Sequence, residues 1–457
     1  MSGNLPFGFT PGGEEPDPGK GGFDMKQLGE MLQQLGSMMA HANDPGAATA
    51  PVNWELASDT ARKAIVAKGD PSVTDGQRSA TETAVDLAEV WLDGVTDFPA
   101  TGGRPATWSR SEWFTSTLPA WQQIINPVAE RVQGTMSGLL PGPGGAGAGL
   151  PEGLPPELAQ MMEPLLGMAK QMGATMFAVQ VAQGLAGLAG EVVSASDVGV
   201  PLTDDGRPAL IPGNITAFGA GLNVPDRETM LFLALRECAH QRLFAHVAWL
   251  RPRMQAAVEE YARGIDIDTD RIESAMSNID PTNPAAIQEV FASGVLVPED
   301  TPEQRAALER LETLLALVEG WVDVVVAAAA ADRLESVGQL QEAIRRRRAA
   351  GGPAERTFAT LVGLELRPRK LREAAALWNA LAERRGQSGR DAVWAHPDLL
   401  PTAADLERPD TFVAATDPAA IADLERALGD LGDGLQALES GDDDEDGDSQ
   451  SGSSEKS

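Results

Sequence analysis

The stretch LFLALRECAHQRLFAHVAWLRP, residues 231–252, decides how the rest of this sequence is interpreted. Its apolar residues recur at helical spacing, and Asp226 just upstream is a good N-cap residue. Glu228 stands in the first turn, where a helix favours negative charge, and Pro252 opposes continuation of the helix. The stretch therefore predicts one long helix, from residue 226 to about residue 250.

One face of this predicted helix mixes polar and large apolar side chains. It carries Leu233, Arg236, Glu237, His240 and Phe244. Because the apolar members of the face should point inward, the charged members should be buried with them. Buried charges of this kind need partners.

The segment RECAH, residues 236–240, matches the zinc-peptidase motif H-E-x-x-H except at its first histidine. In that motif two histidines, four residues apart on a helix, reach one metal ion, and the glutamate acts as general base. Arg236 occupies the position of the first histidine. A guanidinium stays protonated and offers no lone pair, so it cannot replace histidine as a ligand.

A second long helix is predicted from the capping box Thr301-Pro302-Glu303-Gln304 to about residue 333. From residue 313 to residue 331 its only charged residues are Glu319 and Asp323, one helical turn apart. A helix that is apolar on every side is buried. We therefore expect these two carboxylates to meet a cation or a metal ion.

With RECAH and the later VEG of residues 318–320, the sequence resembles the zincin-like metallopeptidases, a hydrolase family widespread in actinobacteria. In that family an H-E-x-x-H helix is followed by a helix bearing L-E-G. The resemblance extends over 231–252 and 400–406, more loosely over 351–374, and covers most of 201–406. It implies a zincin-like core. Together with the helical patterns and the composition of the two ends, this predicts a mainly α fold, a zincin-like helical core with at most a small β element, with disordered termini.

Carried over position by position, the resemblance implies that Glu237 is at the general-base position and that His240 and Glu319 are at zinc-ligand positions. Arg236 stands where the remaining ligand should be, so the motif is degenerate. A physical alternative is that Arg236 supplies the positive charge that zinc would bring, pairing with Glu319 or Asp323 across the two helices. The site would then be the remnant of a metal site that an ion pair now holds together.

Three other residues are weighed as site residues. His246 lies ten residues after Arg236, as does the third histidine of the metzincin motif, but a helix that runs straight on places it off the face of His240. His396 could fold back as a substitute ligand, or it could cap its own loop. Cys238 is expected to be a small buried thiol rather than a nucleophile.

Five parts of the chain are distinguished by composition. They are a mostly disordered segment with a short Met-rich helix at 1–50, an N-terminal helical layer at 51–140, a Gly/Pro linker or loop at 141–156, a zincin-like helical domain at 157–431, and an acidic disordered tail at 432–457.

Three shorter segments carry predictions of their own. The uncharged stretch 171–190 is predicted to be a buried or interfacial helix rather than a membrane span. The stretch 209–218 is predicted to be extended, and it is the candidate for an edge strand near the site. The basic run 345–348 is predicted to be a solvated helix end, with binding of an acidic partner or of the chain's own tail as the alternative.

Composition restricts the partners and the compartment. The formal net charge of -31 over 457 residues disfavours nucleic acid and anionic membranes as partners. The single cysteine excludes an internal disulfide, and we expect no signal peptide, because no basic, apolar, small-residue pattern opens the sequence. We expect a cytoplasmic protein without stable membrane insertion.

Two functions remain open at this point. The first is a catalytically impaired, zincin-like pseudo-enzyme that acts as a scaffold or binds another protein or peptide. The second is an active zinc-dependent metallopeptidase that uses Glu237 as general base, with His240, Glu319 and a substitute ligand holding the metal. Zinc is the only cofactor that the sequence suggests, and the second function requires it.

Overall fold

A computed structural model describes residues 51–139, 174–203, 206–264, 301–349, 370–416 and 426. Three predicted parts lie outside the described residues: the N-terminal segment 1–50, the linker at 141–156 and the acidic tail at 432–457.

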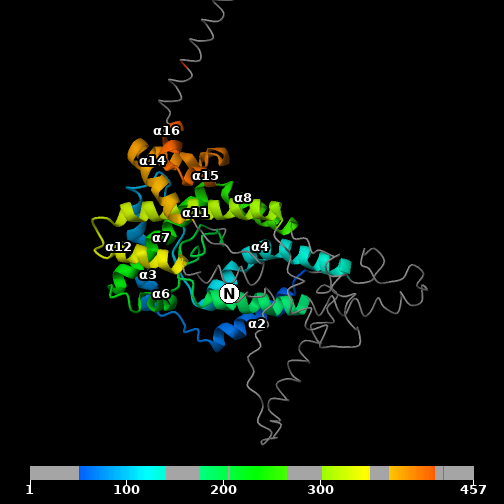
Figure 1. Cartoon of the computed structure of the whole chain (residues 1–457). Helices are drawn as coiled ribbons and strands as arrows, with labels where there is room; N and C mark the ends of the chain where they lie inside the picture. Colours follow the sequence, from blue (N-terminus) through cyan, green and yellow to red (C-terminus); the bar gives the residue numbers. More distant parts are fainter. Residues whose placement is uncertain are drawn as a thin grey trace, which may run out of the picture.

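The described chain is mainly helical, with one small sheet, so the predicted fold class is confirmed (Figure 1). The α-helices are α2 (Trp54–Ala67), α3 (Asp75–Leu92), α4 (Arg110–Leu139), Ala174–Ala189, α6 (Pro212–Gly219), α7 (Asp226–His246), α8 (Leu250–Arg263), α11 (Pro302–Ala330), α12 (Val337–Ala349), α14 (Leu371–Asp391), α15 (Ala403–Leu406) and α16 (Pro409–Ala415). Short 3-10 helices η1 (Ala392–Ala395) and η2 (Pro397–Leu399) follow α14, and β1 (Ala106–Thr107) pairs in parallel with β2 (Ala209–Leu210).

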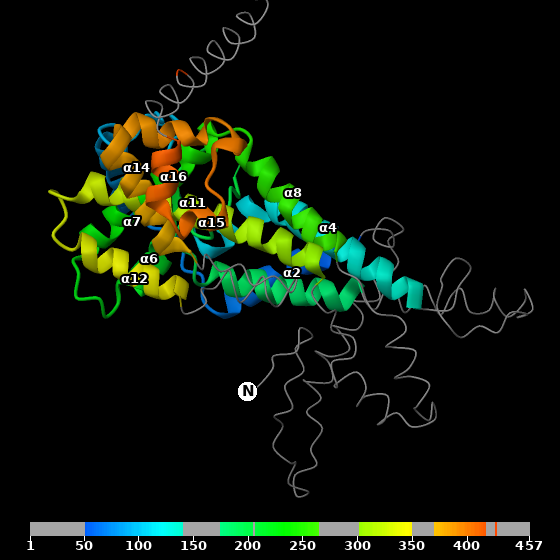
Figure 2. The same ribbon diagram turned by 45° about the horizontal axis from the view of Figure 1, so that its top comes forward.

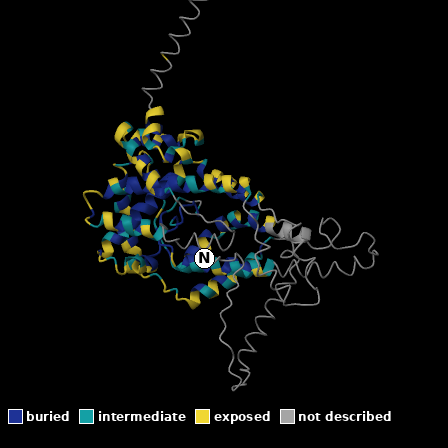
Figure 3. Ribbon diagram, viewed as in Figure 1, coloured by how far each residue is buried: buried dark blue, intermediate teal, exposed yellow. Residues whose placement is uncertain are grey.

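Helix α11 runs through the middle of the protein. It packs against α14, α8 and α7, and Figure 2 shows α8 running beside it. The predicted capping box is confirmed, because Thr301 accepts from Gln304 N and the Gln304 side chain accepts from Thr301 N. Most of the helix beyond its first turns is buried (Figure 3). The carboxylates of Glu319 and Asp323 therefore lie inside the protein.

The apolar helices are covered by the protein itself. Among the described residues, α11 alone is long and apolar enough to cross a membrane, and 83% of its apolar window is buried inside the protein. The prediction of a buried helix at 171–190 is confirmed for Ala174–Ala189. Its buried residues are Ala178, Val181, Ala182, Leu185, Ala186, Leu188 and Ala189. Such burial is typical of core helices.

The boundaries of α7 differ from the prediction at both ends. Pro225 is the N-cap residue and Asp226 is the first helical residue, so Asp226 is not the cap. The helix ends at His246, and α8 begins at Leu250 with Pro252 in its first turn. A proline in a first turn loses no hydrogen bond, because the N–H groups there have no partner within the helix. Pro252 therefore helps to start the next helix instead of ending α7.

The prediction of an extended stretch with an edge strand at 209–218 is confirmed for its first two residues and wrong for the rest. Only Ala209 and Leu210 form a strand, because Pro212 starts α6. On one side β2 pairs with β1, and on the other Ala195 N and Ile211 N donate across to Ala209 O and Val193 O. β2 therefore has β1 on one side and an isolated bridge, Ser194 to Leu210, on the other.

The contact between α11 and α14 depends on Gly320. A Cβ added there would lie 2.8 Å from Ala374 Cβ and 2.8 Å from Ala375 N. We expect Gly320→Ala to lower the free energy of unfolding by about 1–3 kcal/mol through overpacking, measured by urea denaturation. Gly338→Ala in α12 is the matched control, because nothing lies within 4 Å of its added Cβ. It should raise stability by roughly 0.5–1 kcal/mol, and equal effects of the two changes would contradict this account.

Candidate functional site

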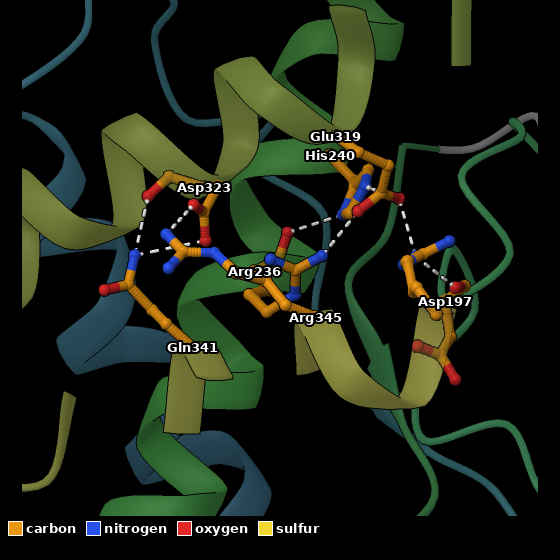
Figure 4. A network of polar contacts seen from close by, with 8 residues as sticks. Asp197, Arg236, His240, Glu319, Asp323, Gln341 and Arg345 are labelled. Carbon is orange, nitrogen blue, oxygen red and sulfur yellow. Dashed lines mark hydrogen bonds and ion pairs between the residues drawn. The ribbon is translucent and has the colours of Figure 1, made fainter. Parts of the chain in front are cut away.

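The buried carboxylate of Glu319 is the centre of the site (Figure 4). Its side chain is 1% exposed. Arg236 Nη2 lies 2.6 Å from Oε2, while Arg348 Nη2 and His240 Nε2 lie 2.7 Å and 3.1 Å from Oε1. Three basic side chains therefore converge on one carboxylate.

Helix α7 presents two of these groups because Arg236 and His240 are four residues apart. Side chains at this spacing lie on the same face of a helix. His240 Nδ1 lies 2.8 Å from the carbonyl oxygen of Arg236, which fixes the ring. The other ring nitrogen, Nε2, lies 3.1 Å from Oε1 of Glu319.

Charge governs the ionisation of Glu319. Burial opposes ionisation, but the positive charges of Arg348, His240 and Arg236 outweigh it and hold the pKa of Glu319 well below its ordinary value. Glu319 is therefore a carboxylate in the folded protein at neutral pH.

A glycine allows the loop before β2 to approach Glu319. Gly199 has φ +78°, and a Cβ at this position would lie 2.9 Å from Glu319 Oε1. Both the left-handed backbone and the close approach favour glycine. The loop therefore packs directly against the carboxylate.

Asp323 has a different cation from Glu319. Arg345 Nη2 lies 2.6 Å from Asp323 Oδ2, and Gln341 Nε2 donates to Oδ1 at 3.1 Å. Both donors belong to α12. Of the two carboxylates considered for Arg236, Glu319 is thus the one that it contacts.

The prediction that residues 345–348 form a solvated helix end is wrong for three of the four arginines. Arg345 and Arg348 bind Asp323 and Glu319, and Arg347 lies 3.0 Å from Asp197 Oδ2. Only Arg346 is largely exposed, with Glu342 as its partner one turn away. A signal was present in the sequence, since arginines three apart on one helix can match carboxylates four apart on another.

Glu237 bonds to a different part of the protein. Its carboxylate accepts from the backbone N–H groups of Ser196 and Ala209 at 3.0 Å and 3.3 Å, and from Gln241 Nε2 at 2.9 Å. Burial raises the pKa of Glu237, although hydrogen bonds from Gln241, Ser194 and Ser196 and the nearby His240 oppose the rise. Glu237 therefore ties α7 to β2 and to the preceding loop. Gln241 and Ser196 are site residues that the sequence analysis missed.

Comparison with known proteins identifies the family of this sequence. The family model for zincin-like metallopeptidases matches residues 52–413. The chain belongs to this family.

A solved structure supports the same fold for this zincin-like protein. It is described as "a putative hydrolase with a novel fold" from Chloroflexus aurantiacus, and it has 20% sequence identity and a TM-score of 0.55. The match covers 80% of this chain and 99% of the other. A search of curated proteins found no significant relative.

The donor set does not fit a catalytic zinc site of the zincin type. Such a site takes three protein ligands, and only His240 and Glu319 occupy ligand positions. Both oxygens of Glu319 are already paired with guanidinium groups, Oε2 with Arg236 and Oε1 with Arg348. No group of three His, Cys, Asp or Glu side chains suited to a metal ion exists within the described parts of the chain.

The two other histidines considered as ligands bind locally. His246 is exposed, lies 2.8 Å from the carbonyl oxygen of Arg242, and stacks on Phe98 at 6.0 Å between centroids. His396 is also exposed, and its Nδ1 accepts from Asp398 N at 3.2 Å, which is the local cap expected for such a loop.

Cys238 has the environment of a core residue. It is buried, and burial together with nearby Glu89 raises the pKa of its thiol well above the ordinary value. A thiol that stays protonated is a poor nucleophile. The prediction of a small buried thiol is confirmed.

The lowered pKa of Glu319 predicts a pH-dependent contribution to stability. Glu319→Gln should cost about 3–5 kcal/mol at neutral pH, because it leaves buried cations without their carboxylate. A depressed folded-state pKa adds stability above the unfolded value, near 4.5, and this stability is lost as pH falls from there toward the folded-state value.

The stability difference between the wild type and Glu319→Gln should therefore shrink as pH falls below 4.5. Urea denaturation of both proteins from pH 7 to pH 3 measures this difference. A difference that stays constant over that range would contradict the ion-pair account.

Proposed function

We propose that this protein is a catalytically impaired zincin-like pseudo-enzyme that binds another protein or a peptide without hydrolysing it. One observation carries the proposal: Arg236, at a metal-ligand position, makes a 2.6 Å ion pair with Glu319, at another ligand position. The guanidinium supplies permanently the positive charge that a metal ion would supply when bound. It cannot bind a water molecule and lower its pKa as zinc does.

The position of Glu237 also supports impaired catalysis. A general base must reach the proton that it removes. The Glu237 carboxylate instead holds two backbone N–H groups and Gln241, so its acceptor capacity is used within the fold. The residue that would act as base in an active relative thus has a structural task here.

Binding of a protein or peptide is the function that a retained scaffold without catalysis can still perform. The net charge of -31 argues against nucleic acid as the partner. The lone, buried Cys238 is consistent with a reducing cytoplasm, the compartment in which we place this activity.

Elemental metal analysis of the full-length protein, purified without a metal-affinity tag, tests the proposal. We expect no stoichiometric zinc in the wild type, before or after incubation with zinc. Arg236→His should gain zinc, because it completes a set of two histidines and Glu319. Adding His240→Ala to that variant should abolish the gain.

The alternative function makes the opposite prediction. An active zinc peptidase would carry near-stoichiometric zinc in the wild type, would lose it in His240→Ala, and would cleave peptides. That combined result would overturn the pseudo-enzyme proposal in favour of catalysis.

A further inference from the structure

Arg236 and Arg348 have unused hydrogen-bond donors beside Glu319. A guanidinium offers five N–H donors, and a bidentate pair with a carboxylate uses two nitrogens. Each of these arginines reaches Glu319 through Nη2 alone. Within the described parts of the chain, the Nε and Nη1 of both arginines make no hydrogen bond.

The two arginine side chains that carry these free donors are almost completely buried. The side chains of Arg236 and Arg348 are only 7% and 14% exposed. Both side chains nevertheless keep a small exposed fraction next to Glu319. A small group could therefore reach the donors, whereas a broad surface could not.

The charge balance around Glu319 favours an anion. Arg236, Arg348 and His240 face one carboxylate. Asp323 is paired with Arg345, and Glu237 is turned toward Ser196 and Ala209. The immediate surroundings of Glu319 thus hold more positive than negative charge, inside a chain with a net charge of -31.

We propose that Arg236 and Arg348 form a binding site for the C-terminal carboxylate of a peptide. This inference rests on the proposed function and specifies what the partner presents. Two guanidinium edges match the two oxygens of a carboxylate. The ligand would approach the arginines from the side that Glu319 leaves free.

Two observations favour the end of a peptide over its middle. The narrow exposure of Arg236 admits a terminal group more readily than a continuous chain. In addition, β2 has neighbours on both sides, so a peptide cannot add to it as another strand. Recognition at this site therefore has to come from side chains acting on a charged end.

The test uses the full-length protein and two pools of randomised N-acetyl hexapeptides, one with free C-terminal carboxylates and one amidated. Each pool is passed over immobilised protein, and the retained peptides are quantified by mass spectrometry. We expect the free-acid pool to be retained at least about tenfold better, as charge-assisted hydrogen bonds imply. Addition of inorganic phosphate should weaken this retention by competing for the guanidinium groups.

Variants on one helix supply the control. Arg348→Gln removes the donors, whereas Arg346→Gln changes an exposed arginine that pairs only with Glu342. Arg236→Lys keeps the charge but loses the planar donor edge. Preference for the free acid should disappear in Arg348→Gln and Arg236→Lys and persist in Arg346→Gln, with melting temperatures confirming that each variant folds.

The outcomes separate this inference from the proposed function. Equal retention of the two pools, or retention of neither, overturns the carboxylate site. Equal retention would still agree with a peptide-binding protein. Cleavage of the retained peptides would instead overturn the proposed absence of catalysis.

Discussion

The ion-paired carboxylate of Glu319 is the constraint on which the rest of the site depends. A charge in the buried middle of α11 is costly unless partners neutralise it and fill its hydrogen bonds. Those partners come from α7 and from α12, while Gly199 lets a loop close over the same carboxylate. One buried charge thus fixes how three separate segments are placed around α11.

Helix α7 serves two sides of the core because successive residues on a helix point about 100° apart. Arg236 and His240 face Glu319, whereas Glu237 and Gln241 face the loop before β2 and the strand itself. The same short motif therefore anchors the helix pair and the small sheet. Loss of metal chemistry would leave both structural tasks intact, which explains how the motif can persist without catalysis.

Exchange of a metal ion for a guanidinium changes the character of such a site. Metal binding requires deprotonated ligands and depends on metal supply, whereas arginine keeps its charge at every physiological pH. Under the proposed function, the helix pair is held together permanently, and the arginine donors that Glu319 does not use become available to a ligand. Under the same proposal, a permanent charge replaces a conditional one, and binding replaces catalysis.

The sequence by itself determined the helical class, the family, the buried position of α11 and the need of Glu319 and Asp323 for cations, because these follow from periodicity, capping residues and the cost of buried charge. Only the tertiary structure decided which cations arrive. Arg348 lies 29 residues from Glu319, and Arg236 lies 83 residues away. Sequence reasoning offered Arg236 as a partner but could not choose between Glu319 and Asp323 for it. It could not tell either that β2 is bridged on both sides or that Glu237 binds backbone amides, since each depends on segments that only packing brings together.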